Sequence, residues 1–441
     1  MAALFSSPQN KYYLSGIDWV ISAFDYTMKK TTSSGNASQI VVEMDPAVDS
    51  ERLGSTIIEF TKYFPVLFGT VVRNMYNLAP YWRVARNRNN RLNIETHYMN
   101  GHSSANGLMP FFEKSINTPF RDKDEHLAFR IIQADSKKTY LTMTFDHRLL
   151  DAHGAETLLD LLRRFVRDNS DRSIFHDIRL TASPAIYSWK KRLHAGGNIN
   201  RKFIAWSRTA FDSLSSGSGR NEGFRFNVNT FDAEETKAIY RNAENEAGYL
   251  MGMAYLLAAV LQGMQNLFKT KGIDSPRFLI GISVDMRKTG ENNQKLFFNH
   301  WSYMFFQIQV DASSTRKELI HVIKQQLYDQ VKTNFSGDFA ESSFLFRIVP
   351  LRVLGKWLNK ELLSFVFSFM SKGPFVPSEF MGSNITNLFH LPRIPVPPGL
   401  GFFFNYFNGL LNFVISYREG LLHNDEIALL ERVIQEQIRT R

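Results

Sequence analysis

The sequence predicts an α/β protein with two layers and two domains, on three observations. Its 441 residues are 44% hydrophobic and can bury a substantial core, and two domains of about 200 residues fit this length best. Segments with the period of a strand alternate along the chain with segments with the period of a helix. Residues 195–223 are enriched in glycine, serine and charge. We expect them to link an N-terminal lobe, 1–194, to a C-terminal lobe, 224–441.

The elements expected early in the N-terminal lobe follow from apolar spacing and from helix-start residues. In order, they are a short helix or ordered segment over 14–30, a strand over 40–44, a helix to about residue 63 with Asp45 as its N-cap and Pro46 in first position, a turn and strand over 64–73, and a strand over 127–133.

The strongest local pattern lies at residues 140–167. Apolar and polar residues alternate over 140–147, as a half-buried strand requires, with His147 on the apolar side at the strand end. After Gly154 the apolar residues recur at helical spacing to about residue 167. The sequence therefore predicts a corner between a strand and a helix, with His147, Asp151 and Gly154 at the corner.

The second half continues the alternation of strands and helices. We expect a strand over 224–228, a helix capped by Asp232 and Glu235, a deeply buried helix over 249–268, strands over 278–284 and 301–310, a helix from Thr315 to about 332, a last strand over 411–417 and a closing helix over 425–438.

The residue types at the corner suit proton transfer. An imidazole in partly apolar surroundings tends to stay neutral near pH 7, which leaves one ring nitrogen of His147 free to accept a proton from a hydroxyl or an amine. We expect Asp151 to hold the corner in shape by pairing with a cation, with direct orientation of the imidazole as the alternative. A single histidine near an acidic residue is also a common feature of cores and surfaces.

Composition limits the chemistry further. The chain has no cysteine, which excludes disulfides, thiolate metal sites and a cysteine nucleophile. Its net charge of +10 favours an anionic partner, although a generally basic protein is an equal interpretation. The sequence has no zinc-finger spacing and no RNA-binding aromatic box, so we expect no nucleic-acid partner. The start of the chain lacks the pattern of a secretory signal, and we expect a cytoplasmic protein.

The corner also resembles a known motif. His147-x-x-x-Asp151 with Gly154 is similar to the His-His-x-x-x-Asp-Gly motif of the chloramphenicol acetyltransferase-like superfamily, which includes nonribosomal peptide condensation domains and BAHD acyltransferases. Asp146 stands where many members have a first histidine, and Ala152 stands where they have glycine. The order of the expected elements resembles the family over nearly the whole chain.

This resemblance implies a fold and an activity. The fold would be two chloramphenicol acetyltransferase-like lobes in a V-shaped pseudo-dimer, with an active-site channel between them. The activity would be transfer of an acyl group from acyl-CoA, or from a phosphopantetheine arm on an acidic carrier protein, to a hydroxyl or amine acceptor, with His147 as general base. The resemblance also implies a monomer with no built-in cofactor and no metal.

The resemblance assigns further site residues. Arg287, just after the strand over 278–284, would form a salt bridge with Asp151 across the two halves, while Gly154 would shape the corner. Asn299 would stand at the start of a channel strand. Ser383 and Asn384 would lie near the channel, where the segment can donate a hydrogen bond to an oxyanion.

Three other functions remain open from the residues alone. His147, Asp151 and His153 could be metal ligands, although their spacing is not a recognised zinc pattern. A serine hydrolase is disfavoured, because Gly281-Ile-Ser-Val-Asp285 lacks the closing glycine of a nucleophile elbow. The third is a binding protein with the same fold and no activity, in contact with a membrane surface.

The apolar and basic stretch 344–372 has three interpretations. It could be core, a wall for a long acyl chain, or an amphipathic helix on a peripheral membrane surface. We expect core, because Glu361 and two serines make a poor membrane face and Pro350 would interrupt the helix near its start.

Overall fold

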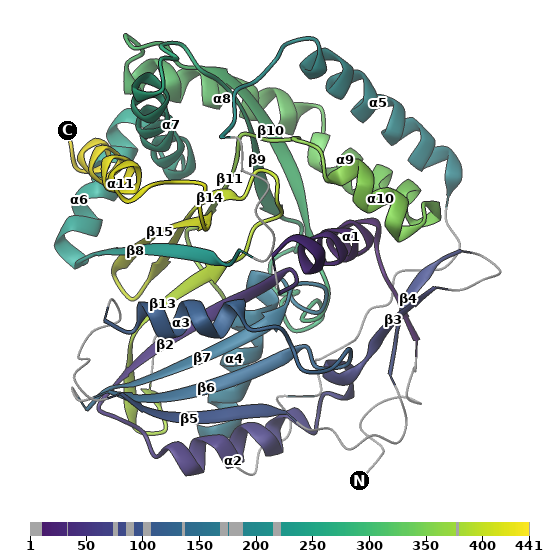
Figure 1. Cartoon of the computed structure of the whole chain (residues 1–441), viewed down its shortest axis with the longest axis vertical. Coiled ribbons are helices and arrows are strands. Elements are labelled where there is room, and N and C mark those ends of the chain that lie inside the picture. The colour runs from purple at the N-terminus through teal and green to yellow at the C-terminus, as the bar shows by residue number, and fades with distance from the viewer. Residues whose placement is uncertain are drawn as a thin grey trace.

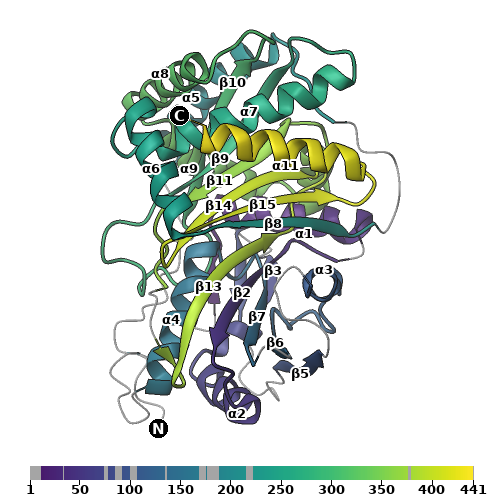
Figure 2. The same ribbon diagram turned by 90° about the vertical axis from the view of Figure 1, so that its left-hand side faces the viewer.

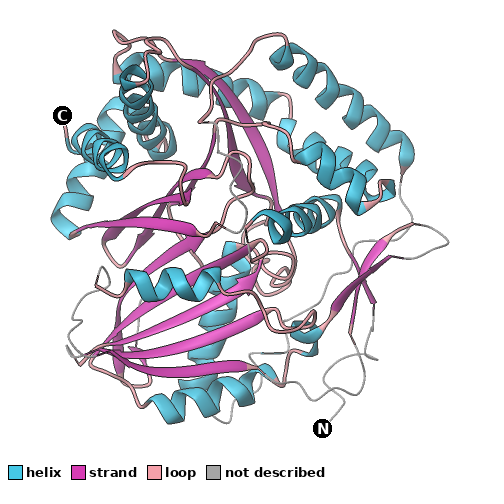
Figure 3. Ribbon diagram, viewed as in Figure 1, coloured by secondary structure: helices cyan, strands magenta, loops and turns pink. Residues whose placement is uncertain are grey.

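Two six-stranded sheets, each covered by helices, make up the protein (Figure 1). This computed structural model describes residues 11–32, 34–73, 78–84, 92–99, 107–134, 137–167, 175, 188–214, 222–375 and 379–440. Figure 3 shows that most of the helices lie around the outside of the two sheets, while others lie between the sheets. The two-lobed α/β architecture expected from the sequence is confirmed.

The sheet of the N-terminal lobe has β7 near its centre. Its strand order is β12-β13-β2-β7-β6-β5, and β7 is antiparallel to both β2 and β6. The strands are β2 (Ala37–Asp45), β5 (Asn93–Met99), β6 (Leu127–Ala134), β7 (Thr139–Asp146), β12 (Glu379–Phe380) and β13 (Ser383–Pro392). The helices of this lobe are α2 (Ser50–Thr61), α3 (Met109–Asn117) and α4 (Ala152–Arg167).

Strand β7 is buried along its whole length, which corrects the expectation of a half-buried strand. Leu141, Met143 and Phe145 pack in the core beneath α2 and α4. The other face is covered too, because α3 places Phe112 against Tyr140 in a second core that includes residues of the C-terminal lobe. Polar residues at this face are thus enclosed by the other half of the chain and do not meet solvent.

The C-terminal lobe has the strand order β10-β9-β11-β14-β15-β8. Helices α6, α7, α8 and α11 pack on one face in the largest hydrophobic cluster, while α5 and α9 pack on the other. The strands are β8 (Phe224–Phe231), β9 (Arg277–Asp285), β10 (Trp301–Gln309), β11 (Phe365–Met370), β14 (Leu400–Phe407) and β15 (Leu410–Arg418). The helices are α5 (Trp189–Ser207), α6 (Ala233–Ala247), α7 (Gly252–Thr270), α8 (Arg316–Lys332), α9 (Phe335–Ser343) and α11 (Asn424–Arg439).

Two strands from the second half of the sequence, β12 and β13, join the sheet of the first lobe. Strand β13 pairs antiparallel with β2, and Figure 2 shows it leaving the upper lobe to lie along the lower sheet. Side chains of β14 and β15 bind it from the other lobe: Asn405 and Asn412 each donate to the carbonyl of Leu388. The C-terminal lobe is therefore not the continuous segment 224–441 that the sequence suggested.

Three local expectations were wrong. The linker predicted over 195–223 includes residues 195–207 of α5, of which Ala195 and Ile199 are buried; residues 215–221 lie outside the described part. Helix α2 begins after Asp49, whose carboxylate accepts from two backbone N–H groups, so Asp45 is not its cap. The helix expected from residue 249, α7, begins at Gly252, and Tyr249 and Leu250 before it are exposed.

The remaining elements position the site. Helix α1 (Gly16–Thr31) begins with a capping box formed by Ser15 and Asp18. A small sheet holds β1 (Lys11–Tyr13), β3 (Thr70–Arg73) and β4 (Pro80–Arg83), with the 3₁₀ helix η1 (Pro65–Phe68) before β3.

The stretch 344–372 is not a single helix. It contains a 3₁₀ helix, η3 (Phe344–Ile348), then α10 (Leu351–Leu358) and β11. Pro350 is the N-cap of α10. Phe365 is core, as expected, whereas Trp357 is 51% exposed, so the stretch divides between core and surface. No single described helix is long and apolar enough to cross a bilayer; only the bent pair α6 and α7, at 95°, meets those criteria when counted together.

Candidate active site

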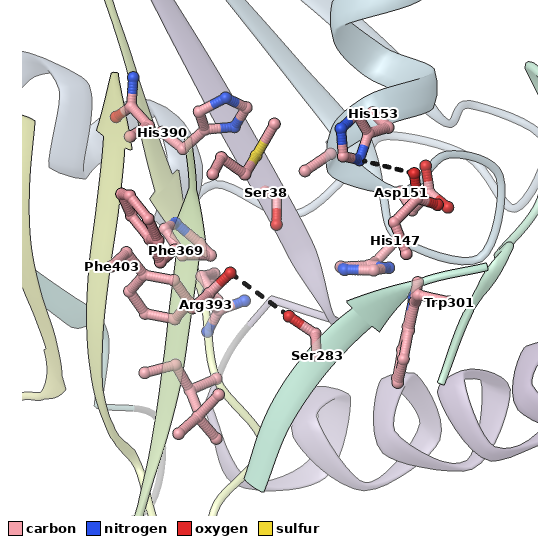
Figure 4. A pocket seen from close by; sticks show the side chains of 18 of the residues that line it. Ser38, His147, Asp151, His153, Ser283, Trp301, Phe369, His390, Arg393 and Phe403 are labelled. Atoms are coloured by element: carbon pink, nitrogen blue, oxygen red, sulfur yellow. Dashed lines mark hydrogen bonds and ion pairs between the residues drawn. The ribbon is translucent and has the colours of Figure 1, made fainter. Parts of the chain in front are cut away.

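A cavity of about 280 Å³ lies between the lobes, and His147 faces it (Figure 4). Its walls come from α1, β7 and α4 on one side and from β9, β10, β11 and β14 on the other, with β13 between them. Figure 4 shows Phe369 and Phe403 together on one wall and Trp301 beside His147.

His147 is the first residue after β7, and its backbone N–H donates to the carbonyl of Asn36 at 3.0 Å. Its ring atom Nδ1 lies 3.0 Å from Oδ1 of Asn299, 152 residues further along the chain. The ring of Trp301 meets the imidazole edge to face, with centroids 6.4 Å apart. The imidazole is thus held on its Nδ1 side by residues of the other lobe.

The hydrogen bonds of Asn299 determine which way its amide points. Nδ2 donates to Oδ1 of Asp18 at 3.0 Å and to the carbonyl of His147 at 2.9 Å, and both of these atoms only accept. Oδ1 receives the indole N–H of Trp301 at 2.9 Å. Oδ1 is therefore the acceptor toward His147, so Nδ1 carries a proton and donates it. In the neutral ring, Nε2 then holds the lone pair that a general base needs.

Asp18 anchors this arrangement from α1. Besides the side-chain amide, its Oδ1 accepts the backbone N–H of Asn299 at 2.9 Å, and its Oδ2 accepts the backbone N–H of Ser15 in the capping box. Sequence reasoning missed Asp18 as a site residue. The capping pattern Ser15-x-x-Asp18 was visible, but nothing in it pointed to a contact 281 residues away.

The expected pair of Asp151 and Arg287 is present and buried. Nη2 of Arg287 lies 2.7 Å and 2.9 Å from the two carboxylate oxygens of Asp151, which also accept the backbone N–H groups of Gly154 and His300. Burial alone would raise the pKa of Asp151, but the charge and hydrogen bonds of Arg287, with His300, outweigh it and lower the pKa to about 2. Asp151 holds the corner and does not contact the imidazole.

Gly154 fits a close approach between the two halves. A Cβ atom there would lie 2.2 Å from the carbonyl oxygen of Leu296, well inside contact distance. The loop that contains Leu296 also carries Asn299, so a residue without a side chain lets this loop pack against the start of α4.

Asp146, directly before His147, belongs to a buried charge network. It lies 2.8 Å from Nδ1 of His126 and accepts from Nε of Arg148 at 3.0 Å, while Arg148 also pairs with Asp25 of α1. Burial by itself would raise the pKa of Asp146, but the charge of Arg148, together with hydrogen bonds from His126 and Arg148, holds it well below its usual range. These charges fix the backbone on both sides of His147.

Two expected site residues lie elsewhere. The hydroxyl of Ser383 donates to the carbonyl of Pro46, and Asn384 pairs with Asp45 at the start of β13. Neither lines the cavity. His390 does, and it lies seven positions further along the strand than Ser383, roughly 23 Å away. The predicted oxyanion role for Ser383 and Asn384 is therefore wrong, because the C-terminal end of β13 lines the cavity and these two residues lie at its N-terminal end.

A metal centre at the corner has little geometric support. The carboxylate of Asp151, the middle member of the suggested ligand set, already accepts hydrogen bonds from Arg287 and from two backbone N–H groups. His153 turns toward Asp285, with Nδ1 3.5 Å from its carboxylate. Among the residues with described positions, no group of three histidine or carboxylate side chains could hold an ion.

Solved structures share this fold. The chain is similar to the trichothecene 15-O-acetyltransferase from Fusarium sporotrichioides, with a TM-score of 0.71 and 13% identity over 97% of this chain and 94% of that one. It is similar to the first condensation domain of the calcium-dependent antibiotic synthetase in complex with a substrate analogue, with a TM-score of 0.69 and 13% identity over 98% and 96%. It is also similar to the starter condensation domain of rhizomide synthetase in complex with C8-CoA and Leu-SNAC, with a TM-score of 0.67 and 10% identity over 97% and 94%.

No protein-family profile matches the sequence, and no curated protein matches it either. The structural likeness confirms, at the level of fold, the resemblance that the motif at His147 suggested. At these identities it establishes the fold alone, so activity has to be argued from the site.

Proposed function

We propose that this protein is an acyltransferase that moves an acyl group from a thioester to a hydroxyl or amine acceptor. The observation that carries the proposal is the protonated Nδ1 of His147, held by Asn299, which leaves Nε2 as the basic atom at a cavity between two lobes. Condensation domains and an acetyltransferase share the fold.

In this mechanism Nε2 of His147 takes the proton of the acceptor as its oxygen or nitrogen attacks the thioester carbonyl. The imidazolium that forms keeps its hydrogen bond to Oδ1 of Asn299. When the tetrahedral intermediate collapses, the carbon–sulfur bond breaks and the departing sulfur takes the proton from Nε2. The products are an ester or amide and a free thiol, and His147 returns to its starting state.

The donor would be acyl-CoA or an acyl group on a phosphopantetheine arm. The net charge of +10 supports a donor that carries phosphates, or an acidic carrier protein. The reaction as written needs no cofactor, since the proton taken from the acceptor passes through His147 to the departing sulfur and no atom changes its oxidation state.

The alternative is a protein with this fold that binds its ligand without turnover. The Asp18–Asn299–His147 arrangement is compatible with both functions, because an unprotonated Nε2 can accept a hydrogen bond from a bound ligand as well as a proton in catalysis. Thiol release from acyl-CoAs of increasing chain length, with alcohols and amines as acceptors, tests the proposal. Acceptor-dependent release by the wild type that His147→Ala loses supports the enzyme; binding of acyl-CoA without release supports the alternative.

We also propose that an anionic membrane surface is a partner. Helix α5 contacts η3, which leads into α10, and both helices lie at the right-hand edge of Figure 1. Their outer faces combine exposed apolar side chains with basic ones, as membrane-surface helices do. The apolar residues are Trp189, Leu193, Ile204, Val353 and Trp357, and the basic ones are Lys190, Arg201, Arg352 and Lys356.

A further inference from the structure

A second histidine lines the same cavity and takes no part in the proposed mechanism. His390 lies on β13, and its Nε2 is 2.7 Å from Oε1 of Glu156 on α4. Both residues are buried. Figure 4 shows the ring of His390 on the cavity wall beyond Ser38, on the side away from Trp301.

The carboxylate of Glu156 fixes the state of Nε2. Glu156 is 3% exposed, and its other oxygen accepts the backbone N–H of Phe375 at 3.4 Å. Gly373 lies so close that a Cβ there would be 1.8 Å from this oxygen, so the carboxylate has little room to turn. Within the described residues, no lysine or arginine pairs with Glu156. Its acceptor-only oxygen requires a proton on Nε2 of His390.

The other ring nitrogen is left for a ligand. In the neutral ring Nδ1 carries a lone pair, and in the described part of the chain His390 makes no side-chain hydrogen bond besides the one to Glu156. His390 lines the cavity, so a donor group of a bound ligand can reach Nδ1 in place of water. The matching ligand group is therefore one with a hydrogen to donate, a hydroxyl or an amine.

The sheet register gives the separation of the two histidines. Ile40 of β2 pairs with His390 on one side and with Met143 of β7 on the other. Two strand spacings place β13 about 10 Å from β7, and the four residues from Met143 to His147 add about 13 Å along the strand. A molecule that reaches both histidines must therefore be elongated, with polar groups near both ends.

We infer that the Glu156–His390 pair is a binding site for a second hydroxyl or amine group of the acceptor. The acceptor would be an elongated diol or amino alcohol that offers one end to His147 and the other to Nδ1 of His390. This deepens the proposed function and rests on it for the identity of the reacting end. The hydrogen bond at His390 does not depend on turnover.

The test measures binding without an acyl donor, so that no turnover can occur while both histidines are present. With the wild-type protein, titration calorimetry compares 1,10-decanediol and 1,12-dodecanediol with 1-decanol and 1-dodecanol. We expect each diol to bind about three- to tenfold more tightly than its monoalcohol, the value of one hydrogen bond. His390→Phe should abolish the preference. His390→Gln should abolish it too, since an amide nitrogen near the Nε2 position can keep the bond to Glu156 without supplying the Nδ1 lone pair.

The control is His153→Phe, which changes another histidine of the cavity wall and should leave the preference for the diol intact. Equal binding of diol and monoalcohol, or a preference that survives in both folded His390 variants, would overturn the inference. If the His390 variants instead weaken binding of octanoyl-CoA, the group belongs to the donor and the assignment to the acceptor is wrong. A diol preference in a protein that shows no acyl transfer with His147 intact would reject the proposed function and keep the site.

Discussion

Oδ1 of Asn299 accepts a hydrogen bond from Nδ1 of His147 at 3.0 Å, so the proposed base is oriented by a residue from the other half of the sequence. Asn299 is in turn held by Asp18 of α1 and by Trp301 at the start of β10. Three separate segments must come together before Nε2 of His147 points into the cavity in its basic form.

Replacing His147 tests the base directly. His147→Ala should lower acyl transfer by about two to four powers of ten, since general-base catalysis contributes on that scale. The fold should persist, because the backbone N–H of His147 still donates to Asn36. Thiol release and circular dichroism measured on the same preparation check both points. Wild-type rates in a folded His147→Ala protein would rule out the mechanism.

Replacing Asn299 tests the orientation of the base. Asn299→Ala should lower kcat by about ten- to a hundredfold, less than the loss of His147, because the imidazole remains but its Nδ1 proton is no longer held. KM for the donor should change little. A matched variant, Trp301→Phe, removes the N–H that reaches Oδ1 of Asn299 but keeps an aromatic ring beside the imidazole, and it should have a smaller effect. An unchanged kcat in Asn299→Ala would show that the contact is only structural.

The ion pair between Asp151 and Arg287 should contribute to the free energy of unfolding. Asp151→Ala or Arg287→Ala leaves a buried charge without its partner and should cost about 3 to 5 kcal/mol. The double variant should be less destabilised than the sum of the two losses, as a double-mutant cycle by urea unfolding would show. Strictly additive losses would contradict the pairing.

The same pair predicts a dependence of stability on pH. The folded pKa of Asp151 is about 2, below its usual value of 3.8, so its stabilisation is fully present above 3.8 and is lost as pH falls toward 2. The contribution is about 2 kcal/mol. The free energies of unfolding of the wild type and of Asp151→Asn, measured from pH 5 to pH 2, should differ at pH 5 and become equal toward pH 2. A constant difference across that range would count against the assignment.

Gly154 and Gly197 form a matched comparison. Gly154→Ala places a Cβ against the carbonyl of Leu296 and should lower both melting temperature and activity, because the loop that carries Asn299 must shift. A Cβ at Gly197, in α5, would meet no atom within 4 Å, and Gly197→Ala should add about 0.5 to 1 kcal/mol of stability. Thermal unfolding of both variants checks the contrast. Similar effects at the two sites would mean that the approach at Gly154 is not tight.

The proposed membrane face predicts binding to anionic vesicles that weakens with salt. Trp189→Ser with Trp357→Ser should release the protein from phosphatidylserine vesicles without unfolding it, because these side chains are 53% and 51% exposed. Tyr249→Ser, another exposed aromatic residue, is the control and should leave binding unchanged. Phe365 is unsuitable for this test because it is buried, and its replacement should unfold the protein. If the folded double variant still co-sediments with vesicles at wild-type levels, this face is not the membrane-binding surface.

The sequence by itself determined most of the elements and the centre of the site. Periodicity located β7 and α4, and the capping boxes at Asp232 and Thr315 located the starts of α6 and α8, because these signals involve residues within a few positions of one another. The motif at His147 and Asp151, and through the family resemblance Arg287, were also available without a structure.

Only the tertiary structure decided what holds His147 and what faces it. Asp18, His126 and Glu156 had no sequence signal, since each acts through a partner that lies 20 to 281 residues away. The predicted place of Ser383 near the cavity was wrong, because β13 crosses from one lobe to the other. The predicted solvent exposure of one face of β7 was wrong too, because the second lobe covers that face. Apolar spacing records which side of a strand is buried by its own neighbours. It carries no information on whether a distant part of the chain packs against the other side of the strand.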